Sequence, residues 1–284
     1  MLHRSLASLC ASAALACGGQ GEKITLRYRP PAGSSQQLAI EQATRMRFEG
    51  GPMAQLGEQE MTMRMFVTQA VTGPVEGGTA VTVTFDSFHV QSPTLPQQGM
   101  DQALRQARGM TGEMVLDDRM RVVRASFAGA PGVPAGLSRQ LGGNVRGASF
   151  AIPFPAQPVG VGDVWTETIE VPLGQVPGAS GPIKATTEAR VLEIRVAEGD
   201  TIVVLDVVSK MPTDPITVSA QGEQATINLA GSLTGDQEFS LARGATVSGK
   251  LGGEVRMTMS SPRTPGGMTM VMDLRLTLRS LGAP

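Results

Sequence analysis

Residues 268–278 read Met-Thr-Met-Val-Met-Asp-Leu-Arg-Leu-Thr-Leu, with methionine or leucine at every even position. Successive side chains of a β-strand point to opposite faces, so this spacing places three methionines and three leucines on one face. The stretch predicts a long strand that is buried on one side and polar on the other.

The same alternation recurs along most of the chain after residue 23, interrupted by turns rich in glycine and proline. Strands are expected over 23–29, 38–48, 61–67, 81–85, 164–171, 183–196, 202–210, 216–230, 233–241, 247–259 and 268–278. Residues 114–127 predict a hairpin about Asp117 and Asp118. Long strands joined by short turns predict an antiparallel arrangement.

Two short helices are expected between these strands, near residues 99–108 and 134–142. The first has helix-forming residues with apolar side chains at helical spacing, and the second begins at Pro134 and ends at a glycine. The fold class is therefore predicted to be mainly β: a large curved antiparallel sheet or half-barrel with two inserted helices. Two separate sheets are the alternative. Residues 23–284 are expected to form a single β-rich domain.

The first residues predict export. A weakly basic start and an apolar stretch suggest a signal peptide over residues 1–16. Ala14-Leu15-Ala16-Cys17-Gly18 resembles the bacterial lipobox, which implies lipidation of Cys17 and a tether over residues 17–22. The chain is then expected to sit in the cell envelope, lipid-anchored, with its domain in the periplasm or otherwise outside the cytoplasmic membrane. The alternative is ordinary signal cleavage near Ala16.

Composition disfavours several kinds of chemistry. With 25 acidic and 24 basic residues, the chain has no charge excess to attract nucleic acid. Beyond the signal peptide His89 is the only histidine; it is expected to be solvated at a strand end. Glu167 alternates with apolar residues and is expected to face water. No metal site, no cofactor and no enzymatic activity are predicted.

Methionine pairs and triplets spaced by two are the main positive feature. They are Met61, Met63 and Met65, then Met257 and Met259, then Met268, Met270 and Met272. Three interpretations remain open: core packing, Cu(I) binding by thioethers, and the lining of a cavity for an apolar ligand. No histidine or cysteine accompanies these methionines, which argues against copper.

Residues 154–165 read Phe-Pro-Ala-Gln-Pro-Val-Gly-Val-Gly-Asp-Val-Trp. Gly162 and Asp163 predict a turn, and Trp165 is expected to anchor the following strand by packing. This FPxxPVxVGDxW string resembles a family of uncharacterised bacterial exported and lipid-anchored proteins. More distantly, the order of strands, a helical insertion and more strands is similar to lipid-binding half-barrels of the lipoprotein-carrier type. That second resemblance implies a curved sheet that holds acyl chains beneath a helical lid.

These observations favour a non-enzymatic envelope lipoprotein that binds a lipid or another apolar ligand in the concavity of a curved sheet. Its partners would be the membrane, through the anchor, and the ligand. The alternative is a membrane-tethered structural module that binds another envelope protein and no small molecule.

Overall fold

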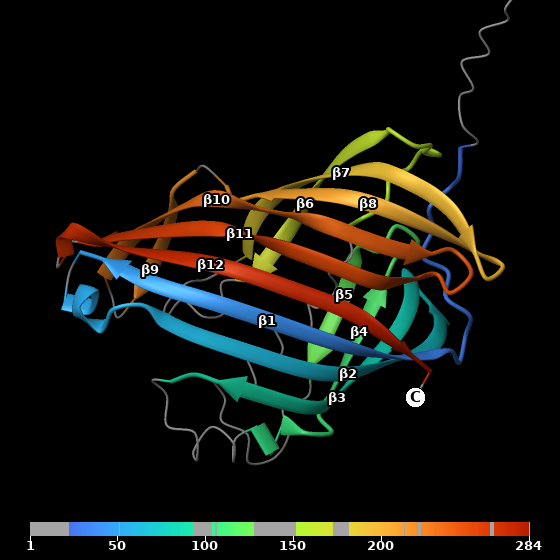
Figure 1. Ribbon diagram of the computed structural model, residues 1–284, viewed down its shortest axis with the longest axis horizontal. Coiled ribbons are helices and arrows are strands. Elements are labelled where there is room, and N and C mark those ends of the chain that lie inside the picture. Colours follow the sequence, from blue (N-terminus) through green and yellow to red (C-terminus); the bar gives the residue numbers. More distant parts are fainter. Residues whose placement is uncertain are drawn as a thin grey trace, which may run out of the picture.

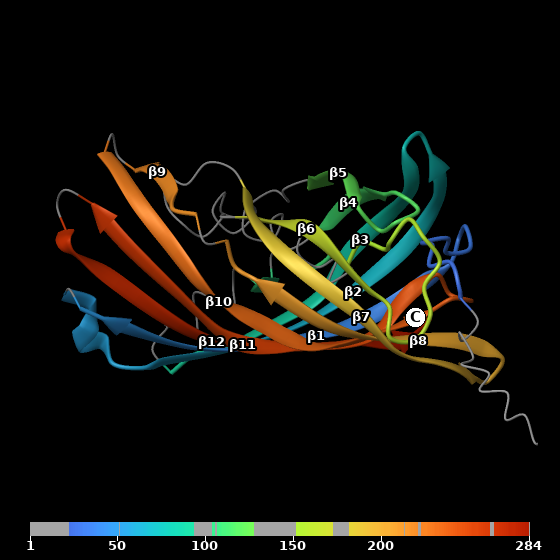
Figure 2. The ribbon, with the colours of Figure 1, turned by 90° about the horizontal axis from the view of Figure 1, so that it is seen from above.

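The computed structural model describes residues 23–50, 52–93, 104–105, 107–127, 152–172, 182–212, 214–220, 223–261 and 264–283. Its strands form one antiparallel sheet of 12 strands that curves into a trough (Figures 1 and 2). The predicted mainly-β, curved antiparallel sheet is confirmed, and the two-sheet alternative is wrong.

The strands are long. They are β1 (Ser35–Glu49), β2 (Gln59–Val75), β3 (Gly78–Gln91), β4 (Thr111–Leu116), β5 (Val122–Phe127), β6 (Val164–Pro172), β7 (Pro182–Ala197), β8 (Asp200–Lys210), β9 (Ile216–Ala220), β10 (Glu223–Ser240), β11 (Ala245–Ser261) and β12 (Thr264–Gly282). A 3₁₀ turn, η1 (Pro52–Leu56), joins β1 to β2.

The strand order is β5-β4-β3-β2-β1-β12-β11-β10-β8-β7-β6, and β9 pairs with the first part of β10. The first and last strands of the chain, β1 and β12, are therefore neighbours in the middle of the sheet. Figure 2 shows β1, β11 and β12 along the floor of the trough, with β5 and β6 above them. The two ends of this strand order are β5 and β6, which follow each other in the sequence.

The structure corrects some predicted boundaries. Residues 23–29 keep the alternation, with Leu26 and Tyr28 buried, but pair only through a bridge between Ile24 and Val159. The strands expected over 216–230 and 233–241 are instead a short β9 and one continuous β10. Of the two predicted helices, the structure describes helical residues 104, 105 and 107 of the first, whereas 134–142 lie outside the described residues.

The main hydrophobic core fills one end of the trough, the end near Leu38 of β1 and Leu278 of β12, which we call the packed end. Segments from outside the sheet contribute Leu26, Tyr28, Ile152 and Phe154 to this core. The ring of Phe154 meets that of Phe239 of β10 edge-on, with 4.7 Å between their centroids. Chain segments thus cover the sheet at this end, in place of a second sheet.

Two glycines in β10 permit the close approach of β10 and β11. A Cβ on Gly235 would lie 1.8 Å from the carbonyl oxygen of Lys250, and one on Gly231 would lie 2.1 Å from that of Glu254. Gly231 also has a φ of +118°, which side-chain-bearing residues rarely adopt. Glycine inside strands marks close backbone approach and sharp bending, so these positions help the sheet to curve.

Among the described residues, no helix is both long enough and apolar enough to cross a membrane.

Candidate functional site: an apolar face on the trough floor

The strand register brings most of the predicted methionines together on the trough floor. Met270 of β12 lies opposite Met257 of β11 on one side and Phe48 of β1 on the other. Met268 lies opposite Met259, and Met272 lies opposite Met46. Directly opposed side chains on one face have Cβ atoms about 4.5–5.5 Å apart, so these thioethers form one patch.

Met61 and Met63 extend this patch on β2, where they lie opposite Thr44 and Gln42 of β1. We call the whole set the methionine face. It comprises Met46, Phe48, Met61, Met63, Met257, Met259, Met268, Met270 and Met272.

Burial separates one predicted residue from the other seven. Met65 is only 3% exposed and belongs to the main core. Met61, Met63, Met257, Met259, Met268, Met270 and Met272 are half-buried. The methionine face is therefore an apolar surface that still has contact with solvent, beyond the packed end.

Met46 and Phe48 were missed by sequence reasoning. Both belong to the alternating stretch 38–48, whose apolar face was predicted, but a single methionine among mixed residues gave no cluster signal. Only the pairing of β1 with β12 reveals that they lie opposite Met272 and Met270.

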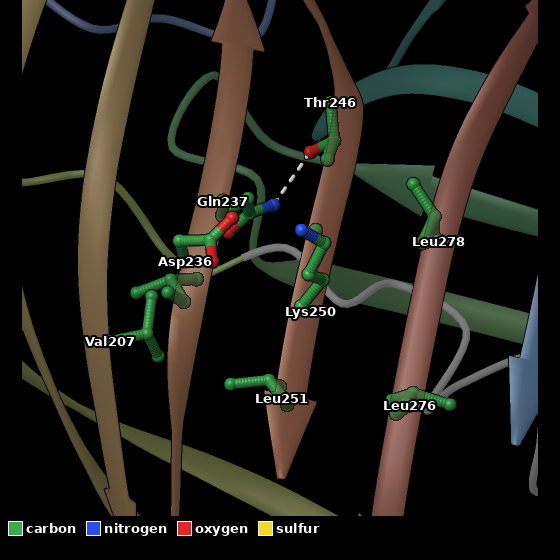
Figure 3. A pocket seen from close by; sticks show the side chains of 10 residues that line it. Val207, Asp236, Gln237, Thr246, Lys250, Leu251, Leu276 and Leu278 are labelled. Atoms are coloured by element: carbon green, nitrogen blue, oxygen red, sulfur yellow. Dashed lines mark hydrogen bonds between the residues drawn. The ribbon is translucent and has the colours of Figure 1, made fainter. Parts of the chain in front are cut away.

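A hollow adjoins the methionine face along the same strands. It contains about 300 Å³ of empty space, including its open side, and lies over β10, β11 and β12 (Figure 3). Its lining residues are Ile152, Val207, Asp236, Gln237, Thr246, Gly249, Lys250, Leu251, Leu276 and Leu278. Gly249 leaves part of the floor without a side chain. Gln237 Nε2 donates a hydrogen bond of 2.7 Å to Thr246 Oγ1 at its edge.

The hollow and the methionine face form one continuous apolar stripe. Leu278 and Leu276 line the hollow, and Leu274, Met272, Met270 and Met268 continue along β12 on the same face. This is the alternating stretch that dominates the sequence. Its six inward side chains run from the packed end over roughly 33 Å, at about 3.3 Å per residue.

Most charges of the floor strands lie on the other side of the sheet. Every Asp, Glu, Lys and Arg of β1, β2 and β12 that the structure describes occupies an outward position of the alternation. Lys250 of β11 and Asp236 of β10 are among the residues that line the hollow. On that outer face, Glu49 accepts hydrogen bonds from Arg256 (2.7 Å) and Arg47 (3.3 Å), which lower the pKa of its carboxyl group. Arg45 pairs with Glu60 there at 2.9 Å. The methionine face is thus uncharged, and most of the charge lies on the outer surface.

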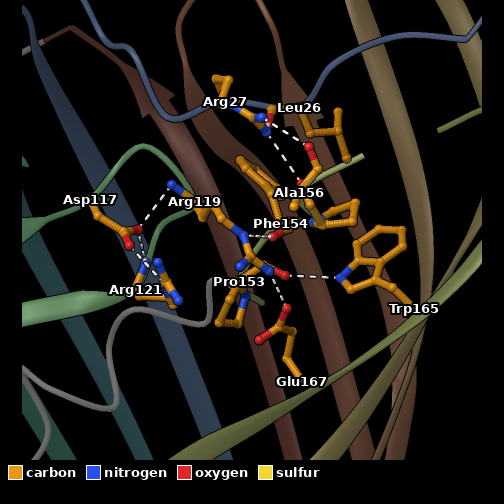
Figure 4. Close-up of polar contacts among 11 residues, drawn as sticks. Leu26, Arg27, Asp117, Arg119, Arg121, Pro153, Phe154, Ala156, Trp165 and Glu167 are labelled. Carbon is orange, nitrogen blue, oxygen red and sulfur yellow. Dashed lines mark hydrogen bonds and ion pairs between the residues drawn. The ribbon is translucent and has the colours of Figure 1, made fainter. Parts of the chain in front are cut away.

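The opposite edges of the sheet are linked by polar contacts at the packed end (Figure 4). Arg119, in the turn between β4 and β5, forms an ion pair with Glu167 of β6 and donates a hydrogen bond to the carbonyl oxygen of Phe154. Arg27 pairs with Asp118 of the same turn at 3.1 Å. We call these five residues the edge clasp. Glu167 is therefore half-buried and paired, contrary to the expectation that it faces water.

The predicted turn and tryptophan lie at the start of β6, at Gly162, Asp163 and Trp165. Gly162 has a φ of +90° in the turn before β6. The N–H of Gly160 and the ammonium of Lys23 donate hydrogen bonds to Asp163 Oδ2, at 2.9 and 3.0 Å, and lower the pKa of Asp163. Trp165 packs against the core and donates its indole N–H to the carbonyl oxygen of Pro153 at 2.9 Å. These contacts dock β6 onto the core.

His89 is exposed on β3, opposite Arg64 of β2. No group of three or more His, Cys, Asp or Glu side chains within the described ranges is placed to hold a metal ion. Cys17, the predicted lipidation site, lies outside the described residues.

Comparison with known proteins shows that this chain has a fold similar to that of a solved structure. No family model matches the chain, and no curated protein matches it. A solved structure of lipovitellin, concerned with its lipid–protein interactions, is 11% identical, with a TM-score of 0.53 over 90% of this chain. This chain spans about a quarter (26%) of that chain. DynF, from the dynemicin biosynthesis pathway of Micromonospora chersina, is 10% identical, with a TM-score of 0.27, over 93% of this chain and 87% of its own.

At this identity, the similarity to lipovitellin demonstrates the fold alone. It agrees with the half-barrel arrangement implied by the second, more distant resemblance. The FPxxPVxVGDxW family resemblance stays a prediction.

Proposed function

We propose that this chain is a non-enzymatic, lipid-anchored protein of the cell envelope that binds a lipid or another apolar ligand on the floor of its trough. The observation that carries the proposal is the half-buried methionine face, which continues into the apolar hollow above Gly249.

The side-chain chemistry of the floor supports this proposal. A sheet that served only as a structural scaffold gains stability by burying its apolar residues fully, at roughly 25 cal/mol per Å². Here the apolar residues of the packed end are buried, whereas the methionines of the methionine face are only half-buried. Unbranched thioether side chains adapt to irregular apolar shapes, which suits a ligand with a flexible hydrocarbon chain.

The architecture of the trough is the second line of support. Its hollow is open on one side, so the apolar surface that it offers to a ligand continues along β12 over the methionine face. Lipovitellin, whose solved structure concerns lipid–protein interactions, has a similar curved sheet. That likeness supports the architecture of the proposed site, and the methionine face supplies its chemistry.

The ligand proposal is tested by native mass spectrometry of the full chain purified from the cells that produce it, followed by organic extraction. We expect a bound apolar molecule at about one per chain. Gly249→Leu places a side chain in the hollow and should lower this occupancy. Gly252→Leu, at an outward position three residues away in β11, is the matched control and should leave it unchanged. If the wild-type chain carries no adduct and extracts without lipid, the protein-interaction alternative is favoured.

The anchor is a separate part of the proposal, and it rests on the lipobox resemblance around Cys17. Cys17→Ala removes the thiol that would carry the lipid. The variant should move from the membrane fraction to the soluble fraction, while its circular dichroism remains that of the wild-type chain. A variant that stays with the membranes after a high-salt wash would argue against lipidation at this residue.

A further inference from the structure

The trough floor contains one polar pair in the middle of its apolar surface. Gln42 and Thr44 are inward residues of β1, and Gln42 Nε2 donates a hydrogen bond of 3.1 Å to Thr44 Oγ1. Thr44 is 4% exposed, whereas Gln42 is half-buried. Among the described residues this is the only hydrogen bond of the Gln42 side chain, so the remaining capacity of its amide faces the trough.

The neighbours of Gln42 place it at the junction between the hollow and the methionine face. It lies opposite Leu276, which lines the hollow, and opposite Met63 of the methionine face. Thr44 lies opposite Leu274 and Met61. An amide surrounded in this way by leucine and methionine side chains is costly to desolvate unless it gains a hydrogen-bond partner.

The uncharged surroundings of Gln42 limit the kind of ligand group that can bind there. The side chains opposite Gln42 and Thr44 on β2 and β12 belong to methionine and leucine, and none of them is charged. The charged residues that line the hollow, Asp236 and Lys250, belong to β10 and β11. An anionic or cationic group held at Gln42 would therefore lose its hydration and meet no counter-charge from the residues opposite Gln42, which is strongly unfavourable. A neutral hydroxyl group loses far less and forms hydrogen bonds with an amide as donor and acceptor.

We infer that the trough selects an uncharged long-chain lipid that carries a hydroxyl group. Its hydroxyl binds at Gln42, and its hydrocarbon chain lies along the inward stripe of β12 towards Met268. From Leu276, opposite Gln42, to Met268 this stripe runs roughly 26 Å, at about 3.3 Å per residue. This inference rests on the proposed function and specifies the ligand class of the same site.

The test compares three probes with the same hydrocarbon chain. Oleyl alcohol has a neutral hydroxyl, octadecene has no polar group, and oleyl sulfate has a permanent negative charge. Each is delivered to the full chain from cyclodextrin and measured by its displacement of the neutral dye N-phenylnaphthylamine. We expect oleyl alcohol to displace the dye at a concentration about tenfold lower than either of the other two, given the net value of a hydrogen bond and the cost of desolvating a charge.

A pair of variants assigns the preference to Gln42. Gln42→Leu should lose the preference for oleyl alcohol over octadecene, when the displacement by each probe is measured against the variant's own affinity for the dye. Gln36→Leu, the same substitution in the same strand, is the control. Gln36 is half-buried, bonded to Gln69 at 3.0 Å and removed from the hollow, and its loss should leave the preference intact.

Each of the other possible results overturns a different claim. If the wild-type chain binds neither the dye nor any probe, the proposed function itself fails. If the three probes compete equally, or if oleyl sulfate competes best, the trough binds apolar ligands but the inference about ligand class is wrong. A preference that survives in Gln42→Leu overturns the assignment of the hydroxyl site to this residue.

Discussion

Arg119 and Glu167 form an ion pair that joins the two opposite edges of the 12-stranded sheet. Arg119 belongs to the turn between β4 and the edge strand β5, and Glu167 belongs to the other edge strand, β6. Their side chains are only 19% and 22% exposed. The same guanidinium binds the carbonyl oxygen of Phe154, so it also fastens the segment that fills the packed end.

Removal of this guanidinium should destabilise the protein. Arg119→Met leaves the carboxylate of Glu167 and the carbonyl of Phe154 without their partner, which should cost about 1–3 kcal/mol of unfolding free energy. Glu167→Gln keeps a hydrogen-bond acceptor and should cost less. Urea unfolding followed by the fluorescence of Trp165, the only tryptophan, measures both.

The control for this pair is Arg45→Met on the outer face. Arg45 and its partner Glu60 are each more than half exposed, at 58% and 55%, so this change should alter stability by no more than about 0.5 kcal/mol. Equal effects of Arg45→Met and Arg119→Met would contradict a special role for the edge clasp.

Tyr28 should make the fold sensitive to alkaline pH. Burial of the phenol raises the pKa of Tyr28 to about 12, compared with about 10 in an unfolded chain. The folded state therefore retains a proton that the unfolded state releases. This contribution to stability is complete below about pH 10 and declines as the pH rises towards 12, by a few kcal/mol at most.

Urea unfolding at a series of pH values checks this, with Tyr28→Phe as the comparison. The phenylalanine variant should lose the part of the alkaline decline that is due to the phenol. Tyr28 is the only tyrosine, so tyrosinate absorbance reports its ionisation directly. An absorbance midpoint near pH 10 in the folded protein would contradict burial of this side chain.

Two glycines on the same face should respond differently to alanine. Gly235→Ala would place a Cβ 1.8 Å from the carbonyl oxygen of Lys250, so β10 and β11 would have to separate. We expect a loss of several kcal/mol or failure to fold. At Gly249 the nearest atom to a new Cβ is the carbonyl oxygen of Asp236, at an ordinary 3.5 Å, and alanine should change stability by less than about 1 kcal/mol. Thermal unfolding of the two variants tests this difference, and similar midpoints would argue against close strand approach at Gly235.

The regular alternation in the sequence was enough to predict the fold class and most strands. Residues 268–278 became the central part of β12, and the turn at Asp117 joins β4 to β5, with its carboxylate accepting hydrogen bonds from the N–H groups of Arg119 and Arg121. Alternation reports only that one side of a segment is buried. This is why residues 23–29 resembled a strand although they pack across the trough with a single bridge. Gly231 resembled a strand end for a similar reason, since a sequence does not reveal that a strand continues through a positive φ.

The sequence predicted which side chains share a strand face at the candidate site, but not which strands bring those faces together. The spacing of Met257, Met259, Met268, Met270 and Met272 correctly indicated shared strand faces. Two further features depend on pairings between strands that are far apart in the sequence. They are the burial of Met65 and the position of Met46 and Gln42 beside the other methionines. The contact between Arg119 and Glu167 depends on the curvature of the whole sheet, which no local pattern records.

Dye binding by two charge variants of β12 tests ligand binding on the trough floor most directly. Met270→Glu places a carboxylate on the methionine face, and Thr277→Glu places the same group on the exposed outer face of the same strand. With circular dichroism showing that both remain folded, N-phenylnaphthylamine is titrated into each full-length variant and into the wild-type chain. We predict wild-type affinity for Thr277→Glu and at least a tenfold loss for Met270→Glu, because the apolar ligand would share the floor with a charge. Equal affinity in all three proteins would show that apolar ligands bind elsewhere and would contradict ligand binding on the trough floor.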